Sequence, residues 1–141
     1  MLWRIGLTII ALFSVLVNFT AGFGMAQNSP DSLTITEKDN KGYFQIALGG
    51  ILTVKLEAIP GTGYAWHVVK NNPRLLKQIG ESVFEPKLVD QRKEIMGAPE
   101  DQVFRFRAQG KESNILSLEY KRKWEKEAAP LKTFSVTVQI N

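Results

Sequence analysis

The chain has 141 residues and a formal net charge of +4 at pH 7, with basic and acidic residues interleaved along its length. This weak excess of positive charge indicates a soluble surface and gives no reason to expect nucleic-acid or membrane binding. The sequence contains no cysteine and one histidine, which excludes disulfides, thiol nucleophiles, thiolate metal sites and multi-histidine metal centres. We therefore expect no cofactor and no metal, and the composition favours binding over catalysis.

Residues 1–26 have the pattern of a secretory signal peptide. Arg4 supplies a positive charge, no charged residue occurs from position 5 to 23, and Gly24 and Ala26 are small residues where signal peptidase reads. An uncleaved membrane anchor is the alternative, because the apolar run is nearly long enough to span a bilayer. Polar and small residues near the end of the run favour cleavage. We expect a secreted or periplasmic protein whose mature domain comprises residues 27–141.

The rest of the chain consists of short segments that alternate between apolar and polar residues and are separated by turn residues. Such segments predict β-strands. They occur at Ser32–Thr36, Tyr43–Leu48, Ile51–Ala58, Ala65–Val69, Ser82–Val89, Gln102–Gln109, Asn114–Arg122 and Leu131–Ile140.

Three features between or within these segments predict local structure. Gly49-Gly50 is a strong signal for a two-residue hairpin that joins the second and third strands. Asn71–Gly80 begins with turn residues and contains a possible single helical turn. Pro86 predicts an edge strand, because proline cannot donate a hydrogen bond within a sheet.

Seven to eight short strands, with turn signals about every eight to twelve residues, are typical of an all-β, immunoglobulin-like β-sandwich. A closed β-barrel is the alternative. In a sandwich, alternate loops gather at one end, which is a natural place for a binding site. Six residues of the later strands are predicted to lie in the core: Phe104, Phe106, Leu116, Leu118, Val136 and Val138.

Three loops contain residues that a simple connection would not need. They are the first loop, Ile59–Tyr64, the second loop, Gly97–Pro99, and the third loop, Arg122–Trp124. In the first loop, proline fixes its own φ and pushes the preceding residue toward an extended conformation. Gly61 and Gly63 allow positive φ and a close approach of the backbone to another group.

The aromatic residues near these loops differ in their expected roles. Trp66 lies within a strand and is expected in the core, as in immunoglobulin domains. Tyr64 can either fill the base of the first loop or contact a partner. His67 is expected to be a solvated strand residue. Trp124 is surrounded by charged residues, which favours contact with a partner.

The order and spacing of the three loops resemble the chagasin-like family of inhibitors of papain-like cysteine proteases. The family pattern is Asn-Pro-x-Thr-Gly-Tyr/Phe, then Gly-x-Gly, then Arg-Pro-Trp/Phe. Ile59 stands where Asn is usual, Pro99 replaces the last glycine, and Lys123 replaces proline. The matching residues are Pro60, Thr62, Gly63, Tyr64, Gly97, Arg122 and Trp124.

The resemblance implies a monomeric, reversible inhibitor whose three loops form a wedge in the active-site cleft of a papain-like or cathepsin L-like protease. In the family, the first loop lies across the catalytic cysteine and histidine, and the other two contact the walls of the cleft. Thr62 is then placed to hydrogen-bond near the catalytic residues. The implied protease-binding residues are Pro60, Gly61, Thr62, Gly63, Tyr64, Gly97, Ala98, Pro99, Arg122, Lys123 and Trp124.

Two other functions remain open from the residues alone. Exposed aromatic side chains also suit an exported immunoglobulin-like binding module that recognises carbohydrate or an envelope protein. An enzyme is the third possibility, and a Ser-His-Asp arrangement would have to use His67, the single histidine.

Overall fold

The structure is a computed structural model that describes residues 28–87 and 97–141. The predicted signal peptide lies outside these residues. In the described residues, no helix is long and apolar enough to cross a membrane. The same residues contain nine strands and two 3₁₀ turns: β1 Ser32–Thr36, η1 Glu37–Asp39, β2 Tyr43–Ile46, β3 Ile51–Ala58, η2 Pro60–Thr62, β4 Tyr64–Lys70, β5 Leu76–Gln78, β6 Val83–Pro86, β7 Glu100–Ala108, β8 Ser113–Arg122 and β9 Lys132–Ile140.

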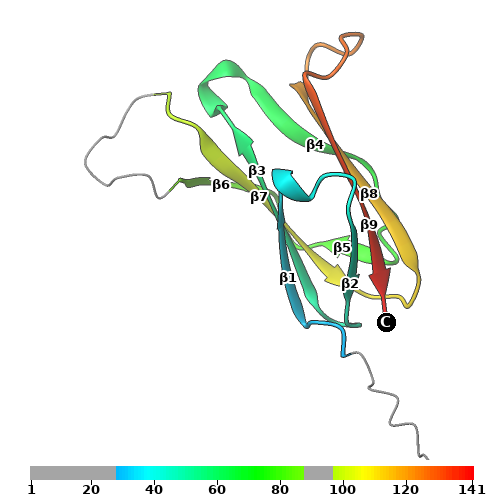
Figure 1. Cartoon of the computed structure of the whole chain (residues 1–141). Helices are drawn as coiled ribbons and strands as arrows, with labels where there is room; N and C mark the ends of the chain where they lie inside the picture. Colours follow the sequence, from blue (N-terminus) through cyan, green and yellow to red (C-terminus); the bar gives the residue numbers. More distant parts are fainter. Residues whose placement is uncertain (1–27, 88–96) are drawn as a thin grey trace, which may run out of the picture.

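The strands form two sheets that pack face to face (Figure 1). The first sheet has the order β1-β3-β7, and both β5 and β6 pair with the far edge of β7. The second sheet has the order β2-β9-β8-β4. The pairs β1–β3 and β2–β9 are parallel and the others are antiparallel. The predicted all-β, immunoglobulin-like sandwich is therefore confirmed, and a closed barrel is not formed.

Alternation along the strands explains how the core is built, because successive side chains point to opposite faces of a sheet. In β3, Leu52, Val54, Leu56 and Ala58 are buried, while the residues between them are half-buried. β8 and β9 alternate in the same way. All six predicted core residues of β7, β8 and β9 are buried, and so is Trp66.

The predicted hairpin at Gly49-Gly50 is wrong. β2 and β3 belong to different sheets, because β2 pairs with β9 and β3 pairs with β1 and β7. The glycines instead form a corner between the sheets. Gly49 has φ +83° and donates its N–H to Ala108 O at 2.8 Å, and Gly50 O accepts from Ala108 N at 2.9 Å. The glycine pair thus predicted a tight turn but not which strands it joins.

β5 is a strand additional to the eight that the sequence predicts. It lies where a single helical turn was expected. The amides of Leu75 and Leu76 both donate to Asn72 O, which forms a turn, and the chain then pairs with Ala108–Phe106 of β7. Leu75 and Leu76 are both buried. The pairing is only three residues long, which is too short for a recognisable alternation in the sequence.

Gln102 joins the two sheets where β4 forms the edge of the second one. Its side-chain oxygen accepts from Trp66 N at 2.7 Å, and its side-chain nitrogen donates to Trp66 O at 3.1 Å and to Ser82 Oγ at 2.9 Å. Gln102 is itself only 3% exposed. Its amide therefore takes the place of a neighbouring strand on the free edge of β4.

We expect Gln102→Leu to lower the free energy of unfolding by about 1–3 kcal/mol, because the buried amide and carbonyl of Trp66 lose their partners. Urea denaturation measures this difference. Gln109→Leu is the matched control, because Gln109 is exposed and directly follows the same strand. Equal stability of the two variants would contradict the assigned role of Gln102.

Candidate functional site

The strand register brings the three loops to the same end of the sandwich (Figure 1). The first and third loops meet because Tyr64 of β4 is paired with Arg122 of β8. The second loop leads into Glu100, which is paired with both Ala58 of β3 and Pro86 of β6. The predicted clustering of these loops at one end is confirmed for their described residues.

The first loop is a short 3₁₀ turn closed by hydrogen bonds within the loop. Thr62 N donates to Ile59 O at 3.1 Å and Gly63 N donates to Pro60 O at 3.2 Å. The Thr62 hydroxyl donates to Ile59 O at 2.7 Å and accepts from Tyr64 N at 3.3 Å. The Thr62 hydroxyl therefore holds the loop in shape, although the side chain as a whole is exposed.

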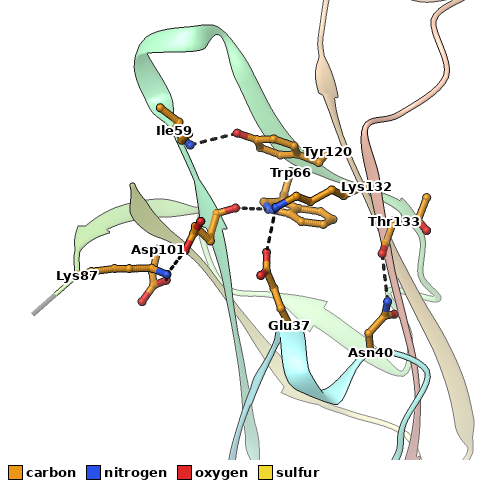
Figure 2. Close-up of polar contacts among 10 residues, drawn as sticks. Glu37, Asn40, Ile59, Trp66, Lys87, Asp101, Tyr120, Lys132 and Thr133 are labelled. Carbon is orange, nitrogen blue, oxygen red and sulfur yellow. Dashed lines mark hydrogen bonds and ion pairs between the residues drawn. The ribbon is translucent and has the colours of Figure 1, made fainter. Parts of the chain in front are cut away.

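Ile59 anchors this loop through its backbone. It is extended, with φ −119° and ψ 91°, as Pro60 predicted. Its N–H donates to the hydroxyl of Tyr120 at 3.1 Å (Figure 2). Its carbonyl accepts from Thr62. These bonds use only main-chain atoms of position 59, so they form without the asparagine of the family pattern.

The third loop is a turn that begins at the end of β8. Glu125 N donates to Arg122 O at 3.2 Å, which makes Lys123 the second residue of a four-residue turn. Proline is favoured at this position because its fixed φ suits the turn. Lys123 thus occupies the place of the family's proline in a turn that forms without it. Trp124, the next residue, is 67% exposed.

Arg122 connects the third loop to the first. Its Nε donates to Thr62 O at 3.1 Å, and its guanidinium carbon lies 4.4 Å from the centre of the Tyr64 ring and 5.9 Å from that of Trp124. A guanidinium at these distances from an aromatic ring is attracted to it. The two loops therefore form one surface without any partner.

Gly63 is required by the contact between these loops. It has φ +78°, and a Cβ placed on it would lie 2.3 Å from Cη2 of Trp124. Gly61 differs, because a Cβ there would meet open space. From the sequence, both glycines allow positive φ and a close approach of the backbone to another group. The structure confirms them for Gly63, and the group that approaches it is the indole of Trp124.

Tyr64 and Trp66 lie beneath the exposed tip. Tyr64 is half-buried and packs against Tyr120, with ring centres 5.6 Å apart, so it fills the base of the first loop. Trp66 also packs against Tyr120 (Figure 2), with ring centres 5.2 Å apart, and its indole N–H donates to Glu57 O at 2.9 Å. The predicted core position of Trp66 is confirmed.

The second loop is exposed at Gly97 and Pro99 and half-buried at Ala98. Gly97 has φ +82°, which glycine adopts easily. At the base of this loop, Lys87 pairs with Glu57 of β3 and with Asp101 of β7. Figure 2 shows Lys87 beside Asp101. These ion pairs connect the strands that carry the first and second loops.

The pKa values of this ion pair shift in opposite directions. The hydrogen bond from Lys87 is the main cause that lowers the pKa of the Glu57 carboxyl, and the nearby charge of Lys132 lowers it slightly further. The same hydrogen bond raises the pKa of Lys87, and the charge of Asp101 adds to this effect. Both shifts favour the charged pair.

His67 is not the fully solvated residue that the sequence predicted. It is half-buried, and its Nε2 is buried without a hydrogen-bond partner among the described residues. It is paired with Glu119 in the register of β4 with β8. In the described part of the chain, no group of three or more acidic or histidine side chains is arranged to hold a metal ion.

Glu125 is a member of this site that sequence reasoning missed. Its Oε1 accepts from Arg122 Nη1 at 3.2 Å. It belongs to the charged run Lys123–Glu127, and a run of mixed charges is by itself typical of a solvated loop. Its spacing of three residues from Arg122 was the available signal, because the ends of a four-residue turn lie close together.

We expect Gly63→Ala to lower the free energy of unfolding by about 1–2 kcal/mol, because alanine is disfavoured in the left-handed backbone region. The added methyl must also displace Trp124, which a shift in tryptophan emission reports. Gly61→Ala is the matched control and should change stability by less than about 0.5 kcal/mol. Urea denaturation followed by fluorescence compares them, and equal effects would contradict the packing of Trp124 on Gly63.

The lowered pKa of Glu57 also predicts a dependence of stability on pH. The unfolded chain binds more protons than the folded chain in the acidic range, so the contribution of the pair is present above the unfolded pKa and lost as pH falls through the folded pKa. We expect the urea midpoint of the wild type to exceed that of Glu57→Gln at neutral pH, and the gap to close below about pH 4. A constant gap would show that the carboxylate charge is not involved.

Comparisons with known proteins agree with this architecture. The sequence model described as chagasin family peptidase inhibitor I42 matches residues 45–138, which include all three loops. The structure is similar to that of the cysteine protease inhibitor EhICP2 from Entamoeba histolytica, with a TM-score of 0.65 and 20% identity over 80% of this chain and 100% of that one. It is also similar to the solution structure of amebosin, with a TM-score of 0.62 and 22% identity over 78% and 98% of the two chains.

The comparison with curated proteins gives no match. At these identities the structural likenesses establish the fold, whereas the family match extends over more than half of the chain and over every loop of the site. The chain belongs to the chagasin family of peptidase inhibitors.

Proposed function

We propose that this protein reversibly inhibits papain-like cysteine proteases by inserting its loop end into the active-site cleft. The observation that carries the proposal is the single surface formed by the first and third loops, with exposed Trp124 packed on Gly63 and joined through Arg122 to Thr62. Membership of the inhibitor family supports it. The protein acts by occupying the cleft, and no catalysis by the inhibitor is required.

The first loop is suited to bind a catalytic centre without being cut. Its tip, Pro60–Thr62, is exposed and has little bulk around Gly61. The hydrogen bonds from Thr62 and Gly63 hold the backbone in a 3₁₀ turn. Cleavage requires a peptide bond held in the geometry of attack. A turn that keeps its own hydrogen bonds does not present its carbonyls in the extended form of a substrate.

Trp124 supplies the anchor that such an interface needs. Exposed aromatic side chains that enter a pocket account for much of the binding energy of protein interfaces. The indole is already fixed at one edge by Gly63, so little side-chain freedom is lost when the partner binds. In the proposed complex, the walls of the same cleft are contacted by Lys123 and by the exposed residues of the second loop, Gly97 and Pro99.

Export of the protein is part of the proposal and depends on the sequence alone. The pattern of residues 1–26 is that of a secretory signal peptide. We propose a secreted or periplasmic inhibitor. The mass of the protein recovered outside the cytoplasm tests this, because cleavage after Ala26 leaves Gln27 as the first residue.

Titration of active papain with the protein tests the inhibitory function, and Trp124→Ala tests the site. We expect inhibition by the wild type and a loss of about 1–3 kcal/mol of binding free energy in the variant. Thermal unfolding should change little, since the side chain is mostly exposed. Val69→Ala is the control, because Val69 is an exposed apolar residue near the far end of β4.

Absence of inhibition by the wild type at micromolar concentration would refute the proposed function. If tryptophan fluorescence then responded to added glycans, a carbohydrate-binding module would be the better assignment. A collapse of thermal stability in Trp124→Ala would instead show that Trp124 is needed for folding, and the loss of inhibition could then not be assigned to protease contact.

A further inference from the structure

Glu125 lies outside the residues assigned to protease binding, yet it is tied to the centre of the site. Its carboxylate accepts from Arg122 Nη1 at 3.2 Å, and its amide donates to Arg122 O at the same distance. About one third of each side chain in this ion pair is exposed. Glu125 is therefore attached to both the main chain and the side chain of Arg122.

Arg122 contacts both loops and Glu125, and we call this set of contacts the Arg122 clasp. The guanidinium donates to Thr62 O in the first loop, stacks over Tyr64 and lies near Trp124, while Glu125 accepts from its outer nitrogen. Arginine presents its donors in a rigid plane, so a bond on one side orients the donors on the other. The carboxylate of Glu125 thus restricts the plane in which Arg122 reaches the first loop.

We propose that Glu125 is a positioning residue for protease inhibition, which it supports by holding Arg122 so that the first and third loops are assembled before a protease binds. This inference rests on the proposed function. Glu125 acts through Arg122 and Trp124 and need not touch the protease. If the site is assembled in only a fraction of the molecules, the apparent affinity is the intrinsic affinity multiplied by that fraction.

Electrostatics supports the same role. An unpaired guanidinium would lose its hydration when the loops enter a cleft, which weakens binding unless a partner compensates its charge. Glu125 compensates that charge within the inhibitor itself. Glu127 is a matched comparison, because it lies in the same connection, is exposed and forms no ion pair among the described residues.

The experiment compares Glu125→Gln with Glu127→Gln in the purified protein. We expect Glu125→Gln to raise the inhibition constant for papain about two- to fivefold, in line with a partly exposed ion pair, and Glu127→Gln to leave it unchanged. Glu125→Gln should also lower the fluorescence anisotropy of Trp124. The emission of Trp124 is identified as the part of the tryptophan signal that is lost in Trp124→Phe. Thermal unfolding of each variant shows that it is folded.

A second variant separates positioning from a general loss of stability. Lysine at position 122 keeps the charge but cannot bond Thr62 and Glu125 with one planar fork. We expect Arg122→Lys to weaken inhibition as well, and the double variant with Glu125→Gln to lose less than the product of the two single effects. If the effect of the double variant equals the product of the two single effects, the two residues act independently and the proposed role of the clasp is wrong.

The outcomes distinguish this inference from the function on which it rests. If the wild type does not inhibit papain, the proposed function is wrong, and the role assigned to Glu125 is wrong with it. If the wild type inhibits but Glu125→Gln matches Glu127→Gln in inhibition and in anisotropy, only the role of Glu125 is wrong. Selective loss of inhibition and anisotropy in Glu125→Gln supports both.

Discussion

The pairing of β4 with β8 is the constraint on which the site depends. This register sets Tyr64 opposite Arg122 and, two residues further into the sandwich, Trp66 opposite Tyr120. A shift of the pairing by one residue would break both pairs, because it turns the side chains of one strand to the other face of the sheet. The burial of Trp66 and Tyr120 therefore fixes where the first and third loops begin, and the core specifies the position of the binding surface.

Hydrogen bonds from buried polar groups hold the loops in position on the core. The ring of Tyr120 is buried, and its hydroxyl accepts a hydrogen bond from the amide of Ile59 at the start of the first loop. Trp66 is held by its indole to Glu57 and by its backbone to Gln102. Buried polar groups that are fully paired favour one arrangement over others, because every alternative leaves a partner unsatisfied. These bonds hold the end of the sandwich that carries the loops in one arrangement.

Much of this architecture could be predicted from the sequence, because strands with one buried face have a period of two. β3 was predicted with its bounds, and the core positions of Phe106 and Trp66 followed from alternation and from position. Contacts between residues distant in sequence could not be predicted. Gln102 gave one signal, since it shares the face of Phe104, but its partner on β4 depends on how the sheets pack. The corner at Gly49 was misassigned for the same reason.

The packing of Trp124 on Gly63 has a consequence for how such inhibitors diversify. The two positions lie on different loops but meet in one volume, so a side chain at position 63 would have to displace the indole at position 124. Sequence change at the tip is therefore coupled across the loops, whereas Gly61 has open space beside it and can vary independently. A change at position 63 therefore also changes the placement of the aromatic side chain on the third loop, whereas a change at position 61 alters the first loop alone.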